Sequence, residues 1–290
     1  MINTGQSIAI LCHEADRSRS QGRYVIHDLA DIWREWGFDV EFIYGTSDAT
    51  PADILFVHVD LSVVPEEYIE FASTYPVTIN AGIRDIRKSV VSPNLITDKD
   101  PWNGPVVVKS DFNFGGAPER RMESRGRRAL RRVHAKFDGL ARRVGFKANR
   151  DEYEIYDTLD MVPESRLRND RLVVEKFRPQ LVDGLYNLQI YQFLGDHWVC
   201  VRLRGKHPIV KSHNAVSAEA TEPHEDIEQW RESLNIDYGK LDYVVVDGEA
   251  ILLDVNKTIG STTLSLSQKM DDGEFAKNRR RLAQGIYDFI

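Results

Sequence analysis

Three side chains with hard oxygen donors stand close together near the end of the sequence. Asp242 lies in a β-type run rich in Val, Tyr and Leu, Asp247-Gly248 is a strong two-residue hairpin turn, and Asp254 and Asn256 lie on the return run. A hairpin that turns there brings Asp242 close to Asp254, and the two-residue spacing sends Asp254 and Asn256 to one face of their strand. Two carboxylates and an amide oxygen suit a Mg²⁺ ion that also holds nucleotide phosphates and keeps some of its waters.

The same hairpin has a second interpretation, as a sheet edge whose polar residues face water. The residues around Asp254 favour the metal, because Ile251 to Leu253 and Val255 indicate a largely buried strand. A carboxylate in such a strand needs a partner. Lys240, two residues before Asp242, is predicted to share a face with it and to place a cation beside the metal.

A second polar element follows the apolar β-type run at residues 106–108. Lys109 ends this run, and Asn113, Gly115 and Gly116 lie in a turn whose backbone amides could approach phosphate oxygens. The segment is not a Walker loop, since no Gly-Lys-Ser/Thr follows it, and no Gly-x-Gly-x-x-Gly occurs in the chain. An ordinary hairpin explains a Lys followed by two glycines as well as a phosphate loop does.

A third element is the apolar run that begins at Leu172 and ends in Glu175, Lys176 and Phe177. Such a strand end could present backbone N–H and C=O groups to the edge of adenine, with the Phe177 ring against the base. The alternative is a strand end without a ligand. We expect Lys109 to point toward Lys176, because both cations would lie near one nucleotide.

The order and spacing of these three elements resemble the ATP-grasp superfamily over roughly residues 80–265. The resemblance implies an α/β (α+β) ATP-grasp fold that uses ATP and Mg²⁺. It also implies a strand lysine on the nucleotide phosphates, a glycine loop that folds over them, and an adenine hinge at the strand end. The residues that match these roles are Lys109 for the phosphate, Asn113, Gly115 and Gly116 for the loop, and Glu175, Lys176 and Phe177 for the hinge.

The closing hairpin looks like that of the D-alanine:D-alanine ligase branch of this superfamily. In that branch an Asp, a Glu and an Asn bind Mg²⁺, and a basic residue two positions before the Asp steadies an acyl phosphate; in this sequence Asp254 stands in place of the Glu. The likeness implies Asp242, Asp254 and Asn256 as metal ligands and Lys240 as the electrostatic catalyst. For the acidic residue that binds ribose beyond the hinge, the candidates are Asp183 and Asn187.

The resemblance implies an ATP-dependent ligase that activates a small carboxylate as an acyl phosphate and joins it to an amine. Arg202 and Arg204 lie in a cluster of cations before the metal hairpin, and Arg202 is a second candidate for stabilising charge in this reaction. A charged surface strand is the alternative explanation of that cluster. Two other functions stay open, a phosphotransferase with the same ATP site and a nucleotide-binding regulatory protein without turnover. The oligomeric state stays open between a monomer and a homodimer, although dimers are common among the relatives.

The elements that must position these residues fall into two predicted domains. Strand and helix patterns alternate over residues 1–84, which indicates a small doubly wound domain of the kind that precedes ATP-grasp domains. Residues 85–290 are the predicted ATP-grasp domain, with a glycine-loop part at about 105–175 and a metal-binding part at about 176–290. The charged loop from His13 to Arg23 follows the first strand, where open α/β sheets bind ligands. It is either solvated or a site for an anionic substrate.

Composition agrees with two cytoplasmic globular domains. The chain has 290 residues, of which 42% are hydrophobic, and a formal net charge of −7. No run approaches the ~20 apolar residues of a membrane span, and the sequence does not open with a signal-type segment. The two cysteines, Cys12 and Cys200, lie in separate apolar runs and predict neither a disulfide framework nor a zinc site.

Residues 119–150 are strongly basic, with twelve Arg or Lys against three acidic residues. Such a charge can attract a polyanion. Apolar residues recur there at helical spacing, so one face of a helix is predicted to pack while the arginines occupy the other. The aromatic residues of the segment, Phe137 and Phe146, do not alternate with the arginines as single-strand recognition requires. The segment therefore favours a solvated or substrate-facing helix over a nucleic-acid surface.

Overall fold

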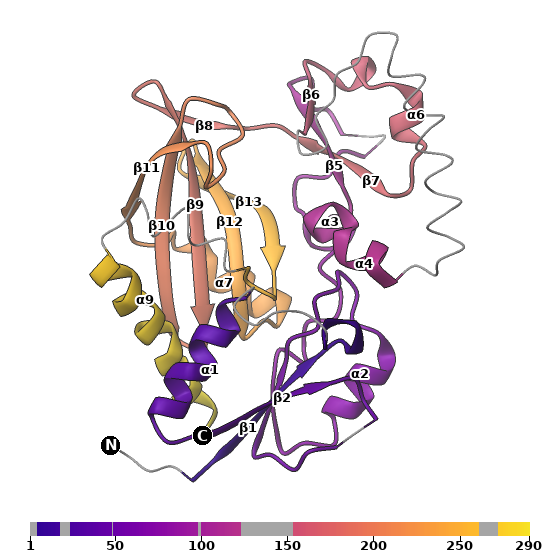
Figure 1. Ribbon diagram of the computed structural model, residues 1–290. Helices are drawn as coiled ribbons and strands as arrows, with labels where there is room; N and C mark the ends of the chain where they lie inside the picture. The colour runs from indigo at the N-terminus through magenta and orange to yellow at the C-terminus, as the bar shows by residue number, and fades with distance from the viewer. Residues whose placement is uncertain (1–4, 18–23, 48, 98–99, 123–152, 261–271) are drawn as a thin grey trace. The chain divides into compact units, whose positions relative to one another are not determined.

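The computed structural model describes residues 5–17, 24–47, 49–97, 100–122, 153–260 and 272–290 (Figure 1). The chain forms two compact units. The first comprises residues 1–86, 90–93 and 178–290, and the second comprises residues 87–89 and 94–177. The N-terminal sheet thus shares a unit with the predicted metal-binding part, while the predicted domain boundary after residue 84 stays a prediction.

The N-terminal sheet is parallel, with the strand order β2-β1-β3-β4. Helix α1 packs on it because Val25, Leu29 and Trp33 recur at helical spacing and are fully buried. The strands and helices that the sequence predicts for this region are therefore confirmed. The elements are β1 (Ser7–Cys12), η1 (Glu14–Asp16), α1 (Val25–Glu35), β2 (Asp39–Tyr44), β3 (Ile54–Val57), α2 (Glu66–Ala72) and β4 (Val77–Ile79).

The same unit contains a six-stranded antiparallel sheet with the order β11-β10-β9-β12-β13, in which β8 also pairs with β9 (Figure 1). One face of this sheet packs against α1 and α9, and the other packs against α7. The elements are β8 (Gln180–Val182), β9 (Leu185–Leu194), β10 (His197–Gly205), β11 (Ala215–Ala220), α7 (Asp226–Leu234), β12 (Tyr238–Val246), β13 (Glu249–Asn256), α9 (Asp272–Gln284) and η5 (Gly285–Phe289).

The second unit is built on a three-stranded antiparallel sheet with the order β6-β5-β7. Val106 and Val108 of the central strand are buried beside Val162. Of the basic segment 119–150, the structure describes residues 119–122 only, so the predicted helix beyond them lies outside the described residues. The elements are β5 (Val106–Ser110), η2 (Asn113–Gly116), α4 (Ala117–Met122), β6 (Glu154–Tyr156), η4 (Leu159–Met161), α6 (Glu164–Leu167) and β7 (Leu172–Lys176), and α3 (Lys88–Val91) lies where residues of the two units meet in sequence.

Both cysteines are free, which agrees with the absence of a disulfide framework in the sequence. Burial raises the pKa of the Cys12 thiol to about 12 and that of the Cys200 thiol to about 11. Neither thiol is therefore a nucleophile near neutral pH. In the described part of the chain, no helix is long and apolar enough to cross a membrane.

A buried histidine at the end of β3 predicts a measurable pH dependence of stability. Burial lowers the pKa of His58 to about 3, whereas an exposed histidine titrates near ~6.5. Between these values the unfolded chain binds a proton that the folded chain does not, so the free energy of unfolding falls as the pH falls. From pH 7 to pH 5 this loss should be about 2 kcal/mol.

Urea unfolding of the wild type and of His58→Gln at both pH values isolates this contribution, because all other groups are common to the two proteins. The wild type should lose about 2 kcal/mol more than the variant. Equal losses in the two proteins would mean that His58 takes up its proton in the folded state.

Candidate functional site

The β12–β13 hairpin sets four polar side chains on one face of the sheet. Asp242 lies directly opposite Asp254, and Lys240 lies directly opposite Asn256. Directly opposed residues of antiparallel strands point to the same face, with Cβ atoms about 5 Å apart. The predicted approach of Asp242 to Asp254 is thus confirmed, as is the shared face of Asp254 and Asn256.

A β-bulge creates this register. Between Asp242 and Tyr243 the pairing shifts, so that Tyr243 opposes Leu252 whereas Asp242 opposes Asp254. Leu253 is the extra residue, and in a regular ladder without the bulge Leu253 rather than Asp254 would lie opposite Asp242. Bulges often lie beside active sites, where they redirect a side chain. The sequence shows no signal for this one.

Lys240 forms an ion pair with Asp242, in which Nζ donates to Oδ2 over 2.7 Å. Their side chains are only 21% and 16% exposed, respectively, so water screens the pair less than it would a surface pair. The cation offsets the repulsion between two carboxylates that face each other across the strands. Asn256 Oδ1 accepts a hydrogen bond of 2.8 Å from the backbone N–H of Thr258.

The donor atoms of this face fit Mg²⁺ by their chemistry. Two carboxylates and one amide oxygen are hard ligands, and Mg²⁺ is usually held by one or two carboxylates together with phosphates and waters. Among the described residues, no group of three or more His, Cys, Asp or Glu gathers to form a protein-only metal cage. The hairpin is therefore suited to an ion shared with a phosphate ligand.

In the second unit Lys109 forms a buried ion pair with Glu175. Nζ lies 2.6 Å from Oε2, and the two side chains are 8% and 1% exposed. Both residues point to one face of the three-stranded sheet, because Glu175 lies opposite Val107, two residues before Lys109. The sequence places these residues 66 positions apart, and no local pattern predicts their contact.

The expectation that Lys109 points toward Lys176 is wrong. Lys176 lies opposite Val106, so its side chain leaves the other face of the sheet. There its Nζ pairs with Asp100 over 2.8 Å. Each lysine therefore has its own carboxylate. Glu175 and Lys176 are neighbours on β7 and point to opposite faces of the sheet, so Glu175 is the one that can compensate the buried charge of Lys109.

The predicted adenine hinge has part of its backbone already engaged. The N–H of Lys176 donates to the carbonyl of Asn94, and the N–H of Phe177 donates to the carbonyl of Pro105, each over 2.9 Å. That Glu175, Lys176 and Phe177 contact adenine remains a prediction. The groups that would make these contacts are their backbone carbonyls and the Phe177 ring. These two N–H groups are not available to a base in this conformation.

The predicted glycine loop forms the short helix η2. Phe114, Gly115 and Gly116 have φ values of 47°, 62° and 70°, a left-handed run that glycine adopts without strain. Arg120 donates to the carbonyl of Gly115. A Cβ atom at Gly116 would lie 3.5 Å from Nη1 of Arg120 and 3.6 Å from Nη2 of Arg171. Two guanidinium groups thus approach the loop, and no local sequence pattern predicts either approach.

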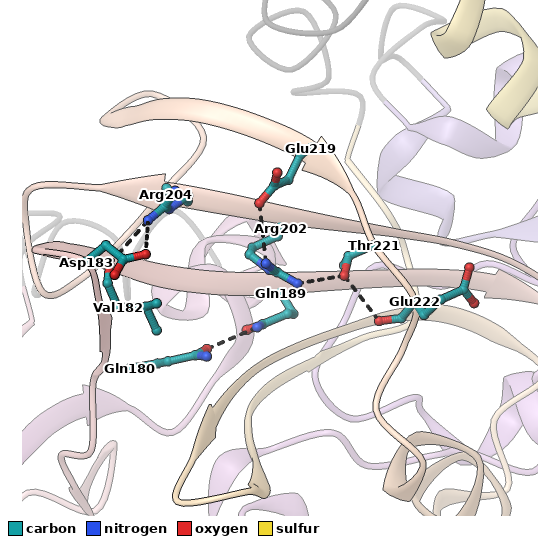
Figure 2. Close-up of polar contacts among 9 residues, drawn as sticks. All are labelled: Gln180, Val182, Asp183, Gln189, Arg202, Arg204, Glu219, Thr221 and Glu222. Carbon is teal, nitrogen blue, oxygen red and sulfur yellow. Dashed lines mark hydrogen bonds and ion pairs between the residues drawn. The ribbon is translucent and has the colours of Figure 1, made fainter.

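Arg202 and Arg204 share a face of β10, as predicted. They lie opposite Gln189 and Asn187 of β9, respectively. Figure 2 shows the polar contacts of the two guanidinium groups. Arg202 contacts Glu219 at 3.4 Å and donates to Thr221 Oγ1 over 2.9 Å.

This face is not the face of the metal hairpin. Lys240 lies opposite Gln192 of β9, and Gln192 is an odd number of residues from Gln189, the partner of Arg202. Side chains alternate along a strand, so Arg202 and Lys240 leave opposite faces of the sheet. The structure does not bring Arg202 to the hairpin, and a catalytic role for Arg202 stays a prediction.

The remaining predicted residues lie at turns. Asp183 sits in the β8–β9 turn with a φ of 51° and a highly exposed side chain, 3.9 Å from Arg204 (Figure 2). Its ribose role remains a prediction. In the loop after β1, His13 is buried against the ring of Tyr68, and Arg17 donates to the carbonyl of Tyr44 over 3.1 Å. Residues 18–23 of that loop, including the other two arginines, lie outside the described residues.

No protein-family model and no curated protein matches this sequence. Solved structures similar to the chain include the D-alanine–D-alanine ligase from Bacillus anthracis, with 11% identity and a TM-score of 0.45 over 97% of this chain and 98% of that chain. A RiPP-associated ATP-grasp ligase from Chryseobacterium gregarium, in complex with ADP and a leader and core peptide, has 12% identity and a TM-score of 0.47 over 96% and 97% of the two chains. A RimK domain ATP-grasp protein from Sphaerobacter thermophilus has 13% identity and a TM-score of 0.48 over 97% and 99%.

Proposed function

We propose that the protein is an ATP- and Mg²⁺-dependent ligase that joins a carboxylate to an amine. The observation that carries the proposal is the hairpin register, which sets Asp242 against Asp254 and Lys240 against Asn256 on one face. A cation beside a set of hard oxygen ligands is what a reaction with accumulating phosphate charge needs.

The metal ligands in this proposal are Asp242, Asp254 and Asn256. A bound Mg²⁺ would neutralise phosphate oxygens and so make the terminal phosphorus easier to attack. Lys240 reaches the same face and holds Asp242 in place through its ion pair. When charge develops on the reacting carboxylate, the ammonium group of Lys240 is positioned to stabilise it.

The second unit supports nucleotide binding through its cations. Lys109, which pairs with Glu175, is one of these cations, and Arg120 and Arg171 lie beside the glycine loop. Backbone amides of a left-handed loop and nearby guanidinium groups are both common ligands for phosphate. We assign these residues to the triphosphate of ATP, and Glu175 to Phe177 to the adenosine end.

The reaction has two steps. A carboxylate oxygen of the acid attacks the γ-phosphorus of ATP, the bond to the bridging oxygen breaks, and ADP leaves. The amine nitrogen then attacks the acyl carbon, inorganic phosphate leaves with one of the original carboxylate oxygens, and the nitrogen loses a proton. The protein contributes position and charge stabilisation in both steps.

The test begins with an ADP-release screen of amino acids and small carboxylates in pairs. With a productive pair, ¹⁸O from the labelled carboxylate should appear in the released phosphate. Label confined to a phosphorylated product, without need of an amine, would indicate a phosphotransferase. ATP binding without any ADP release would indicate a nucleotide-binding regulatory protein.

Lys240→Ala should lower the rate of the chemical step while leaving ATP affinity nearly unchanged, because its interaction strengthens only as charge develops. Single-turnover kinetics at saturating ATP measure the first quantity, and equilibrium binding measures the second. Lys206→Ala is the matched control, because Lys206 is an exposed residue beyond the end of β10. A parallel loss of ATP affinity in Lys240→Ala would contradict the role in the chemical step.

A further inference from the structure

The segment that follows Asn256 is tied to the N-terminal parallel sheet and to α1. Each of residues 257–260 makes a polar contact with this part of the chain. The contacts are Lys257 Nζ to the carbonyl of Leu61, Thr258 Oγ1 to Asp60 Oδ1, the N–H of Val25 to the carbonyl of Ile259, and the bridge between Tyr24 and Gly260. The β12–β13 hairpin is therefore followed by a segment that contacts the residues at the carboxyl ends of the parallel strands.

Asp60 is the acidic residue among these contacts. It lies three residues after β3, at the edge where parallel sheets present their ligand-binding residues. Both of its carboxylate oxygens accept hydroxyl hydrogen bonds, Oδ1 from Thr258 over 2.9 Å and Oδ2 from Tyr24. Two hydroxyl donors hold the carboxylate in one orientation.

Thr258 joins this carboxylate to the proposed metal ligand. Its backbone N–H donates to Asn256 Oδ1 over 2.8 Å, and its hydroxyl oxygen lies 3.4 Å from the same atom. A flipped amide would set two N–H donors against each other, so Thr258 fixes which atom of Asn256 is the oxygen. A single hydroxyl oxygen separates the Asp60 carboxylate from that amide oxygen.

We propose that Asp60 is a positioning residue of the metal site, acting through Thr258 on Asn256 and adding negative charge outside the direct ligands. Mg²⁺ keeps several of its waters, and carboxylates beyond the direct ligands accept hydrogen bonds from such waters. The inference rests on the proposed function, because it assigns Asn256 to the metal. It extends the site to the segment that follows β3 of the N-terminal sheet.

Two substitutions separate the two contributions of this link. Asp60→Asn keeps the size of the side chain and removes its charge. Thr258→Val keeps the backbone N–H and the shape and removes only the hydroxyl. Asp53→Asn is the matched control, because Asp53 receives two hydrogen bonds from Ser7 at the opposite edge of the same sheet.

Mn²⁺ is titrated into the full chain in the presence of ADP. The electron paramagnetic resonance signal of free Mn²⁺ measures how much of the ion is bound. Asp60→Asn should raise the dissociation constant for Mn²⁺ about tenfold or more, as loss of partners outside the direct ligands generally does. Thr258→Val should raise it by a smaller factor, about threefold. Thr258→Ser, which restores the hydroxyl, and Asp53→Asn should both bind like the wild type.

The outcomes distinguish this inference from the proposed function. If Asp254→Asn loses Mn²⁺ binding while Asp60→Asn and Thr258→Val bind Mn²⁺ like the wild type, Asp60 has only a structural role. The inference about Asp60 then fails, and the proposed metal site stands. If Asp254→Asn also binds like the wild type, the hairpin is not the metal site and both proposals fail. Should Asp60→Asn not fold, the comparison of Thr258→Val with Thr258→Ser decides, since equal affinities of those two would overturn the link.

Discussion

Asp254→Asn should abolish Mg²⁺-dependent ADP formation without weakening the fold. The substitution keeps the shape of the side chain and removes one of two carboxylates that face each other across the β12–β13 hairpin. Like charges directly opposed in a sheet are destabilising, so the free energy of unfolding should stay the same or rise. Turnover should fall by a factor of at least ~100, because a ligand outweighs the ~10–100-fold effects of residues behind it.

Asp247→Asn is the matched control for this prediction. Asp247 lies in the turn of the same hairpin with a φ of 56°, a conformation that asparagine adopts readily, and its side chain is 87% exposed. The control should keep full turnover in steady-state assays. Thermal unfolding of both variants completes the comparison. If Asp254→Asn were unfolded at the assay temperature while Asp247→Asn stayed folded, the loss of turnover would come from the fold and Asp254 would have a structural role.

Lys109→Met should destabilise the second unit strongly. Removing one partner of a buried ion pair leaves the other charge without compensation, at a cost of about 3–5 kcal/mol. Lys109 and Glu175 are 8% and 1% exposed, so water cannot replace the lost partner. Hydrogen exchange of the β5 and β7 amides reports this change where it occurs. The double variant Lys109→Met, Glu175→Leu should recover most of the stability, because both charges are then absent.

Arg166→Met serves as the control in the same unit. Arg166 donates two hydrogen bonds to Glu154, over 2.7 and 2.9 Å, but the two side chains are 36% and 27% exposed, so its loss should cost about 1–2 kcal/mol, less than the loss of Lys109. Because the double variant Lys109→Met, Glu175→Leu should stay folded, it also tests whether Lys109 binds the phosphates of ATP. Its dissociation constant for ATP should rise more than tenfold, equivalent to at least ~1.4 kcal/mol. Unchanged affinity would leave Lys109 as a purely structural cation.

The sequence by itself determined the local elements and the residues with chemical potential. Alternation of strand and helix patterns predicted the parallel N-terminal sheet, and the Asp247-Gly248 pair predicted the hairpin. Both residues of that turn have positive φ values, 56° and 85°, which is the conformation their types favour. Periods of two and 3.6 residues and turn chemistry are encoded by neighbours in the chain, so a single sequence carries them.

The tertiary structure alone decided which of these residues meet. A bulge at Leu253 aligns Asp254 with Asp242, and the register of β7 gives Glu175 rather than Lys176 to Lys109. The order of strands sends Arg202 to the face away from Lys240. A one-residue shift in register moves a side chain to the other face of a sheet. Register is set by long-range packing and by the partner that each buried charge requires, and neither is a property of a local segment.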